Sequence, residues 1–499
     1  MEKNGRFKAK IKNIDLESGG YYIVILNKKF AEDNNIHEHD RIRLKKRGKS
    51  LTVVVNHSTK IIRYDEMGAF REVSKALGLK KGERIYFEHI KKPESINHIK
   101  KKLAGEELTK TEIDEIVKNI VDNELSSIEL AFFVSAVYTK EMTMDEVENL
   151  TRSIVKRGDS LKLEKTIIAD KHCIGGVPGN RTTMVVVPIV ASAGIPIPKT
   201  SSRAITSPSG TADTMEVLAP VDIPVTRVKK IIDKINGSIS WGGAVNIASA
   251  DDKLIKIRKP LRLDPTGLLV ASIMAKKMAM GATHLLIDIP IGNEAKLESI
   301  GEAQHLKRYF EEIGGRLGIK TKVWISDGSK PIGKGVGPAL EARDVVAVLQ
   351  GNGPVDLKEK SIDMAGMILE MTGKTNGKKL AEKLLESGQA WKKMQEIIKE
   401  QGGNPNIKPA DIKVGKYKYE CKAEKSGSVV KVSNTGIAKI ARGAGAPVEK
   451  GSGVYLNKCV GAKVEKGDVI LTIYSEGPWK LNRAVEIYKE RKPFEIQKI

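Results

Sequence analysis

From Thr166 onward, short apolar segments alternate with longer segments of helical periodicity, and this alternation constrains the fold more than any other feature. Residues 166–169 and 285–289 are two such segments, and both have the length and composition of buried strands. Strands and helices that alternate in this way form a mostly parallel sheet covered by helices. The sequence therefore predicts a large α/β domain over residues 161–411.

Three further regions differ in texture from this α/β domain. Residues 1–90 carry short β-rich runs at 21–26 and 51–56, with one helix expected over 66–77. Residues 94–160 read as a helical domain, to which about residues 249–279 are expected to return. Residues 412–499 contain strands separated by glycine, which predicts a C-terminal α+β domain.

In the helical region, local sequence patterns predict where the helices begin. Three S/T-x-x-E capping boxes mark helix starts at Thr109/Glu112, Ser126/Glu129 and Thr143/Glu146. Behind the first box, apolar residues follow the spacing of a buried helical stripe at Ile113, Ile116, Val117, Ile120 and Val121. A compact helical domain is the expected result.

The net charge and the aromatic content of the chain indicate what kind of molecule it binds. The chain has 499 residues and a formal charge of +23, which suggests nucleic acid as a first interpretation. The lysines are spread along the chain, however, and only 5% of the residues are aromatic, so few side chains can stack on bases. We therefore favour a solvated lysine- and glutamate-rich surface, as in thermophiles, that attracts anionic substrates. An RNA-binding protein with a vestigial active site remains the alternative from another class.

The sequence shows no export signal and no membrane-spanning segment, so we expect a cytoplasmic protein without a membrane partner. The three cysteines, Cys173, Cys421 and Cys459, are odd in number and widely separated. This spacing fits neither a disulfide framework nor a zinc site. We expect no metal and no organic cofactor.

The first motif with chemical content is ADKHCIGGVPGNRTT, residues 169–183. An expected strand runs into Lys171 and a loop with Gly175, Gly176 and Gly179, and a helix follows near Asn180. Backbone N–H groups at such a helix start can hold an anion, and Lys171 and Thr182 add a charge and a hydroxyl. A tight turn that merely requires glycine is the alternative interpretation.

The second motif is KTSSRAITSPSGTADTMEVL, residues 199–218, again a short strand followed by a hydroxyl-rich loop and a helix near Thr211. Its small donors suit free phosphate or a phosphorylated sugar. Open α/β sheets bind ligands beyond the carboxyl ends of their strands, where both loops are expected. Any single serine here could instead serve as a helix cap.

The third motif covers residues 257–282, whose second half is helical and places Ser272 and Lys276 one turn apart. Asp264 precedes Pro265 at the start of this helix, where an acidic cap is the plain alternative.

Together these motifs resemble the thymidine and pyrimidine nucleoside phosphorylases. KHCIGG is similar to their K-H-S-x-G-G phosphate loop, and SSRAITSPSGTADTME follows the spacing of S-G-R-[GA]-L-x-x-T-G-G-T-x-D-x-[LIVM]-E. ASIMAKKMAMGA resembles their base-binding helix, and the likeness continues through residues 326–349 to the end of the chain. The additional N-terminal 90 residues are similar to those of the archaeal AMP phosphorylases, which this chain resembles over its whole length.

This resemblance implies roles for particular residues. Phosphate is expected at Lys171, Gly175, Thr182, Ser201 and Thr211. Asp264 is expected to donate a proton to the leaving base. The nucleotide is expected at Gly176, Ser202, Arg203, Ala204, Ile205, Thr206, Ser207, Thr211, Arg258, Ser272, Lys276 and Lys296.

The resemblance also implies a reaction, which is phosphorolysis of AMP by inorganic phosphate to adenine and ribose 1,5-bisphosphate. CMP and UMP are further candidate substrates. Cys173, Ser202, Ser207, Pro208 and Ser209 depart from the nucleoside phosphorylase pattern, which argues against thymidine. The expected assembly is a homodimer or a higher homo-oligomer formed through the N-terminal domain, and closure between the helical and α/β domains is expected to complete the site.

Two other enzymes within the fold remain open. A pyrimidine nucleoside phosphorylase shares the phosphate motifs but does not need a proton donor such as Asp264. SGTADTMEVL also resembles the S-G-[ST]-A-D-x-L-E motif of anthranilate phosphoribosyltransferases. The sequence lacks a clear paired-acid magnesium motif, which argues against diphosphate transfer.

Overall fold

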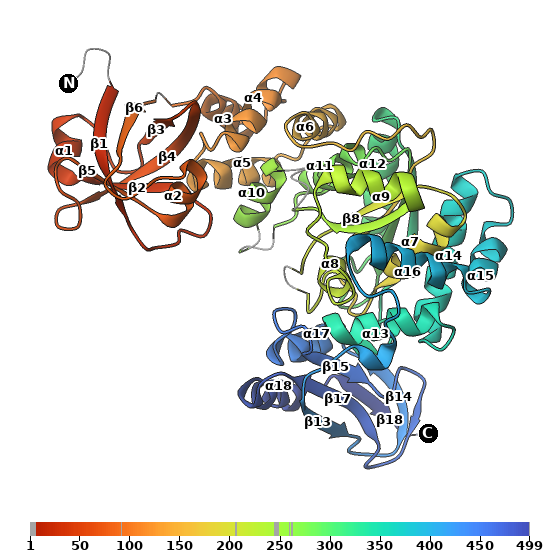
Figure 1. Ribbon diagram of the computed structural model, residues 1–499. Coiled ribbons are helices and arrows are strands. Elements are labelled where there is room, and N and C mark those ends of the chain that lie inside the picture. Colours follow the sequence, from red (N-terminus) through yellow and green to blue (C-terminus); the bar gives the residue numbers. More distant parts are fainter. Residues whose placement is uncertain are drawn as a thin grey trace. The chain divides into compact units, whose positions relative to one another are not determined.

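The computed structural model describes residues 6–90, 92–204, 207–243, 249–258, 260 and 263–498 (Figure 1). It divides into two compact units. The first comprises Met1–Arg157 and Ser249–Ala271, and the second comprises Gly158–Ala248 and Ser272–Ile499. The predicted fold class is confirmed, because a β-rich N-terminal domain, a helical bundle, an α/β domain and a C-terminal α+β domain follow one another along the chain.

The N-terminal region forms a closed barrel with the strand order β1-β5-β2-β4-β3-β6. Its elements are β1 (Arg6–Asn13), β2 (Ile23–Asn27), α1 (Lys28–Asp33), β3 (Arg41–Lys46), β4 (Lys49–Ser58), β5 (Glu66–Ala69), α2 (Arg71–Leu77) and β6 (Arg84–His89). Alternating apolar side chains such as Val24, Leu26, Val53, Val55 and Phe87 fill the interior. Closure pairs β6 with β1 and leaves the sheet without a free edge.

The prediction of a helix over residues 66–77 was wrong in its first part. Glu66–Ala69 is strand β5, and the helix begins only at Arg71. β5 pairs in parallel with β1, with Lys10 opposite Glu66. A Cβ on Gly68 would lie 2.8 Å from the Ile62 side chain and 3.0 Å from that of Ile14. Pairing with β1 in the closed barrel therefore outweighs the local helical pattern of these residues.

The helical bundle belongs to the first unit. It consists of α3 (Ser95–Leu103), α4 (Lys110–Val121), α5 (Ser127–Thr139), α6 (Met144–Lys156) and α10 (Ser249–Arg258), and α11 (Thr266–Ala279) begins in it. The three predicted capping boxes are confirmed, with reciprocal hydrogen bonds at each helix start. Four residues of the predicted stripe on α4 are buried, and Val121 is half-buried.

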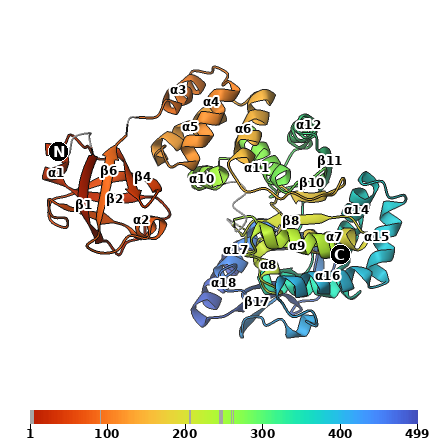
Figure 2. The same cartoon turned by 45° about the horizontal axis from the view of Figure 1, so that its top comes forward.

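The α/β domain contains a parallel sheet of order β11-β10-β7 and a parallel pair β8-β9. Its strands are β7 (Ala169–Cys173), β8 (Ile197–Ser201), β9 (Gly237–Trp241), β10 (His284–Ile291) and β11 (Lys320–Asp327). Its helices are α7 (Thr182–Ser192), α8 (Thr211–Met215), α9 (Val225–Ile235), α12 (Ile300–Arg316), α13 (Pro338–Leu349), α14 (Val355–Met371), α15 (Gly377–Glu386) and α16 (Gln389–Gln401). Helix α12 runs beside β10 and β11 (Figure 2).

Of the two strands predicted in this domain, the second is confirmed, whereas the first was wrong in its bounds, because residues 166–168 are not in a strand. Residues 285–289 lie inside β10, whereas the first strand starts at Ala169 instead of Thr166. In the sheet Lys171 stands opposite Leu286, and Cys173 stands opposite Asp288. The first Gly-rich loop therefore leaves the carboxyl end of β7.

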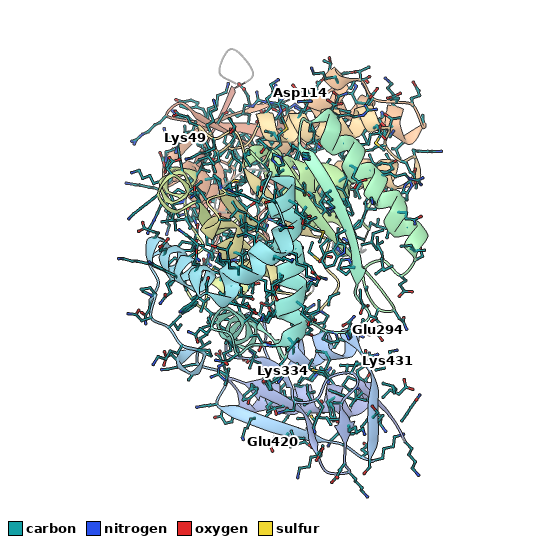
Figure 3. All side chains as sticks on the ribbon, turned by 90° about the vertical axis from the view of Figure 1, so that its right-hand side faces the viewer. Lys49, Asp114, Glu294, Lys334, Glu420 and Lys431 are labelled. Carbon is teal, nitrogen blue, oxygen red and sulfur yellow. The ribbon has the colours of Figure 1, made fainter. Side chains whose placement is uncertain are left out.

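The C-terminal α+β domain closes the second unit with two small sheets, of order β12-β15-β17-β13 and β16-β14-β18. Its elements are β12 (Gly335–Val336), η1 (Pro409–Asp411), β13 (Tyr417–Lys422), β14 (Gly427–Val432), α17 (Asn434–Gly443), β15 (Gly453–Leu456), β16 (Lys463–Val464), β17 (Val469–Ser475), α18 (Pro478–Arg491) and β18 (Phe494–Gln497). Glu294, after β10, faces Lys431 of β14 at 3.7 Å (Figure 3). Glu294 also accepts a hydrogen bond of 2.7 Å from Ser433, so this domain is tied to the loop after β10.

Among the described helices, none is both long and apolar enough to span a membrane.

Candidate active site

The first loop lies between β7 and α7 and is organised around Lys171. This side chain is only 1% exposed, and its Nζ donates to Thr182 Oγ1 at 2.8 Å and to Thr183 Oγ1 at 3.0 Å. Burial lowers the pKa of Lys171 to about 8. Both threonines lie in the first turn of α7, whose N–H groups have no partner within the helix. The loop therefore gathers a cation, two hydroxyls and a helix N-terminus.

Gly175 and Gly176 give this loop its path. Their φ angles are +91° and +97°, in the region that side chains other than glycine rarely adopt. A Cβ on Gly176 would lie 2.5 Å from the backbone nitrogen of Lys296, whereas nothing lies within 4 Å of one on Gly175. The structure thus brings Lys296, a predicted site residue on a distant segment, against the first loop.

Cys173 lines the same loop as a thiol. Its Sγ accepts hydrogen bonds from Gly175 N at 3.4 Å and Asn180 Nδ2 at 3.5 Å. Burial raises the pKa of the Cys173 thiol to about 12, so it stays protonated and shapes the loop without adding charge.

Two further buried lysines, Lys199 and Lys277, lie near Asp170 of β7. Asp170 accepts a hydrogen bond of 2.8 Å from Lys277 and faces Lys199 at 3.9 Å, so one carboxylate faces two buried lysines. Burial holds the pKa of Lys199 well below its ordinary value, and the positive charge of Lys277 lowers it further. The motif analysis did not identify either lysine.

The second loop leaves β8 and is closed at its base by Asp213. One oxygen of this carboxylate accepts from Ala204 N at 2.7 Å and from Gly210 N at 2.9 Å. Ser201, Ser202, Ser207 and Thr211 lie on or next to the loop, as predicted, whereas Ile205 and Thr206 fall outside the described residues.

Arg203 pairs with carboxylates of its own chain. Its guanidinium donates to Glu216 at 2.7 Å and 2.5 Å and stacks over Trp241 at 4.9 Å. The hydrogen bonds to Glu216 raise the pKa of Arg203 above its ordinary value. Lys450 of the C-terminal domain also reaches Glu216, at 2.8 Å. In this structure Arg203 therefore braces the second loop.

The residues predicted to face the base are divided between the two units. Arg258 Nη1 and Asp264 Oδ1 lie 3.3 Å apart in the first unit. In the second unit Lys276 Nζ donates to Ser272 Oγ at 3.3 Å, which confirms the predicted one-turn spacing on α11. The Asp264 side chain is 42% exposed.

Sequence reasoning missed Thr183 and Arg181, which contact predicted residues, and also Glu341, which contacts Arg181. Thr183 shares Lys171 with Thr182 and was signalled only by the repeated threonine. Arg181 reaches from the first loop to the second, donating to Thr211 Oγ1 at 3.2 Å and to Ser209 O at 2.7 Å. Glu341 of α13 accepts from Arg181, and no local pattern links these two positions. Within the described residues, no group of three or more His, Cys, Asp or Glu side chains could hold a metal ion.

Comparison with known proteins shows which family has this sequence and fold. The glycosyl transferase family helical bundle domain matches residues 96–158, and the family's a/b domain matches residues 165–391. The pyrimidine nucleoside phosphorylase C-terminal domain matches residues 428–494. The AMP phosphorylase of Thermococcus kodakarensis is 45% identical over 494 residues, which cover 98% of each chain. The chain belongs to the AMP phosphorylase family.

A second relative agrees with this membership, and a solved structure shares the fold. The AMP phosphorylase of Methanocaldococcus jannaschii is 44% identical over 495 residues, covering 98% of this chain and 97% of that one. Among solved structures, anthranilate phosphoribosyltransferase from Thermus thermophilus has a TM-score of 0.53 at 19% identity, covering 61% of this chain and 98% of that one. That likeness concerns the fold alone.

The low pKa of Lys171 gives its predicted role in phosphate binding a testable pH dependence. Lys171 is a cation below its pKa of about 8 and loses its charge as the pH rises through that value. We expect kcat/KM for phosphate to fall between about pH 7.5 and 9.5, the range in which a lysine of this pKa titrates while phosphate stays a dianion. A kcat/KM that is constant across this range would contradict the assignment.

Gly176 and Gly175 form a matched pair for testing the first loop. Gly175→Ala should cost only the backbone strain, about 1–2 kcal/mol. Gly176→Ala carries similar strain and must also displace Lys296, so we expect it to raise the KM for phosphate at least about tenfold more than Gly175→Ala does. Steady-state kinetics of both variants measures the KM for phosphate. Equal values for the two variants would refute the expectation that the Lys296 contact matters for phosphate binding.

Proposed function

We propose that the protein catalyses phosphorolysis of AMP by inorganic phosphate, giving adenine and ribose 1,5-bisphosphate. The observation that carries this proposal is the identity of 45% over 98% of the chain with a relative named AMP phosphorylase. The two adjacent loops support it, because the reaction needs both a free phosphate and a nucleotide that carries its own phosphate. CMP and UMP are further candidate substrates.

In this proposal the first loop and the end of β8 bind inorganic phosphate. Lys171 supplies charge, Thr182 and Thr211 supply hydroxyls, and Gly175 and Ser201 complete the set. Thr183 joins them because it shares the Lys171 ammonium. A buried cation whose hydrogen bonds are already arranged binds an anion without reorganising during the reaction.

The nucleotide then occupies the remaining predicted positions. The 5′-phosphate is assigned to the second loop, where Ser202, Ala204 and Ser207 offer donors, and to Lys296 beside Gly176. Because Arg203 is held by Glu216, its proposed contribution is to shape this loop. The base is assigned to Arg258, Ser272 and Lys276.

The chemical step exchanges one bond at the anomeric carbon for another. A phosphate oxygen forms a bond to this carbon as the bond to the base breaks, through a transition state with positive charge on the ribose, as in glycoside hydrolysis. The electron pair of the broken bond goes to adenine, which takes a proton on a ring nitrogen. We assign that proton to Asp264.

Asp264 must be protonated before it can act as the acid. In the structure it faces Arg258, a residue also assigned to the base.

The proposed assembly is a homodimer or a higher homo-oligomer formed through the N-terminal barrel, which exposes Ile61, Tyr64 and Tyr86. The three cysteines are free, which suits the reducing, cytoplasmic compartment that we infer.

Release of free base from AMP, CMP, UMP, adenosine and thymidine, each with and without inorganic phosphate, tests the reaction. We expect adenine release from AMP that depends on phosphate, and far less from adenosine, because adenosine lacks the 5′-phosphate for the second loop. Release from thymidine or uridine alone would instead favour a pyrimidine nucleoside phosphorylase, to which the match at residues 428–494 also points.

Asp264→Asn tests the acid. A lost general acid typically costs about 10²–10⁴-fold, so we expect kcat to fall by that factor while the KM for phosphate changes little. Asp252→Asn, which alters an exposed aspartate of α10 in the same unit, is the control and should keep kcat unchanged. If Asp264→Asn retains the kcat of the unmodified enzyme, another group donates the proton.

A further inference from the structure

Arg181 lies at the junction between the two phosphate loops. It is the N-cap residue of α7, between Asn180 and Thr182, whose side chains bond the first loop. Its own side chain turns away from that loop toward the second one. There one guanidinium nitrogen donates to Thr211 Oγ1 at 3.2 Å, and another donates to Ser209 O at 2.7 Å.

Glu341 accepts a hydrogen bond from the third nitrogen of this guanidinium. It lies in the first turn of α13, is 1% exposed, and accepts a hydrogen bond from Arg181 Nε. Its other oxygen accepts from Gly337 N at 3.1 Å, which ties the carboxylate to the start of its own helix. Glu341 is thus anchored to α13 and presents a charge to Arg181.

Glu341 also reaches the second loop through Thr214. Thr214 Oγ1 lies 3.0 Å from Glu341 Oε2 and 2.8 Å from Ser209 Oγ. The second loop is therefore held twice by this pair, directly by Arg181 at Ser209 and Thr211 and indirectly by Glu341 through Thr214. Both contacts fall at the end of the loop that carries Thr211.

We propose that Arg181 and Glu341 are positioning residues, which set the separation of the two loops so that Lys171 and Thr211 meet the same phosphate ion. The proposal rests on the assignment of both loops to phosphate, made above. Neither residue needs to touch the substrate. Their effect on the reaction passes through Thr182 on one side and Thr211 on the other.

The chemistry of the pair favours a geometric role over a purely stabilising one. Replacing a buried ion pair by well-packed apolar side chains is often neutral or stabilising, so stability alone does not explain its presence. The planar guanidinium donates in three fixed directions, toward a helix, a hydroxyl and a carbonyl. Lysine carries the same charge but lacks this rigid fork.

The test compares Arg181→Met, Arg181→Lys and the double variant Arg181→Met/Glu341→Gln with the unmodified enzyme. We expect Arg181→Met to raise the KM for phosphate about 10- to 100-fold, as displaced binding groups do, and to raise the KM for AMP less. Arg181→Lys should recover little of this loss. The double variant leaves no unpaired buried charge, so its melting temperature should rise above that of Arg181→Met while its phosphate KM stays high.

Arg343→Met is the matched control. Arg343 lies on the same helix, two residues from Glu341, and donates to Ile412 O at 2.9 Å, away from both loops. It should lower the melting temperature without changing the KM for phosphate. A double variant that recovers the phosphate KM along with stability would overturn the proposal, and so would a phosphate KM in Arg343→Met raised as far as in Arg181→Met.

Calorimetric binding of inorganic phosphate to each variant, without nucleotide, separates this proposal from the proposed reaction. Weaker phosphate binding in Arg181→Met than in Arg343→Met supports the positioning role even if AMP proves not to be the substrate. Equal binding in these two variants refutes it, whatever reaction the enzyme catalyses.

Discussion

Lys171 is a cation buried at the carboxyl end of β7, and the arrangement of the site depends on how it is kept there. A buried ammonium group is costly unless oxygen atoms replace the water that it has lost. Thr182 and Thr183 provide two of these oxygens, and they do so because α7 begins where the first loop ends. The loop must therefore fold tightly, which explains why Gly175 and Gly176 carry positive φ angles there.

The second loop is organised by charges that face the protein. Asp213 closes its base, and Glu216 holds Arg203 while Lys450 reaches in from the C-terminal domain. In these contacts Arg203, Asp213 and Glu216, three charged residues of the motif, are paired within the protein. The remaining groups of the loop are hydroxyls and backbone N–H groups, which suit the phosphate that we propose it binds. The Arg181–Glu341 pair links this loop to the first.

Much of the fold and part of the site could be predicted from local sequence. The capping boxes at Thr109, Ser126 and Thr143 succeed because both partners lie within one turn. The two loops were found because glycine and hydroxyl residues follow each strand. Strand β5 was missed because it forms only by pairing with β1 and β2, which lie far from it in the sequence. Glu341 was missed for the same reason, since its partner Arg181 is 160 residues away.

The sequence by itself determined the class of fold, the order of the domains and the positions of the two loops that contain glycine and hydroxyl residues, because helical periodicity, capping and glycine-dependent turns act over a few residues. Tertiary structure alone decided that Lys171 is buried, that Lys296 lies against Gly176, and that Arg203 faces Glu216. The physical reason is desolvation: whether a charge binds a ligand or a neighbouring carboxylate depends on what the packed chain places around it. Such neighbours come from segments that no local pattern connects.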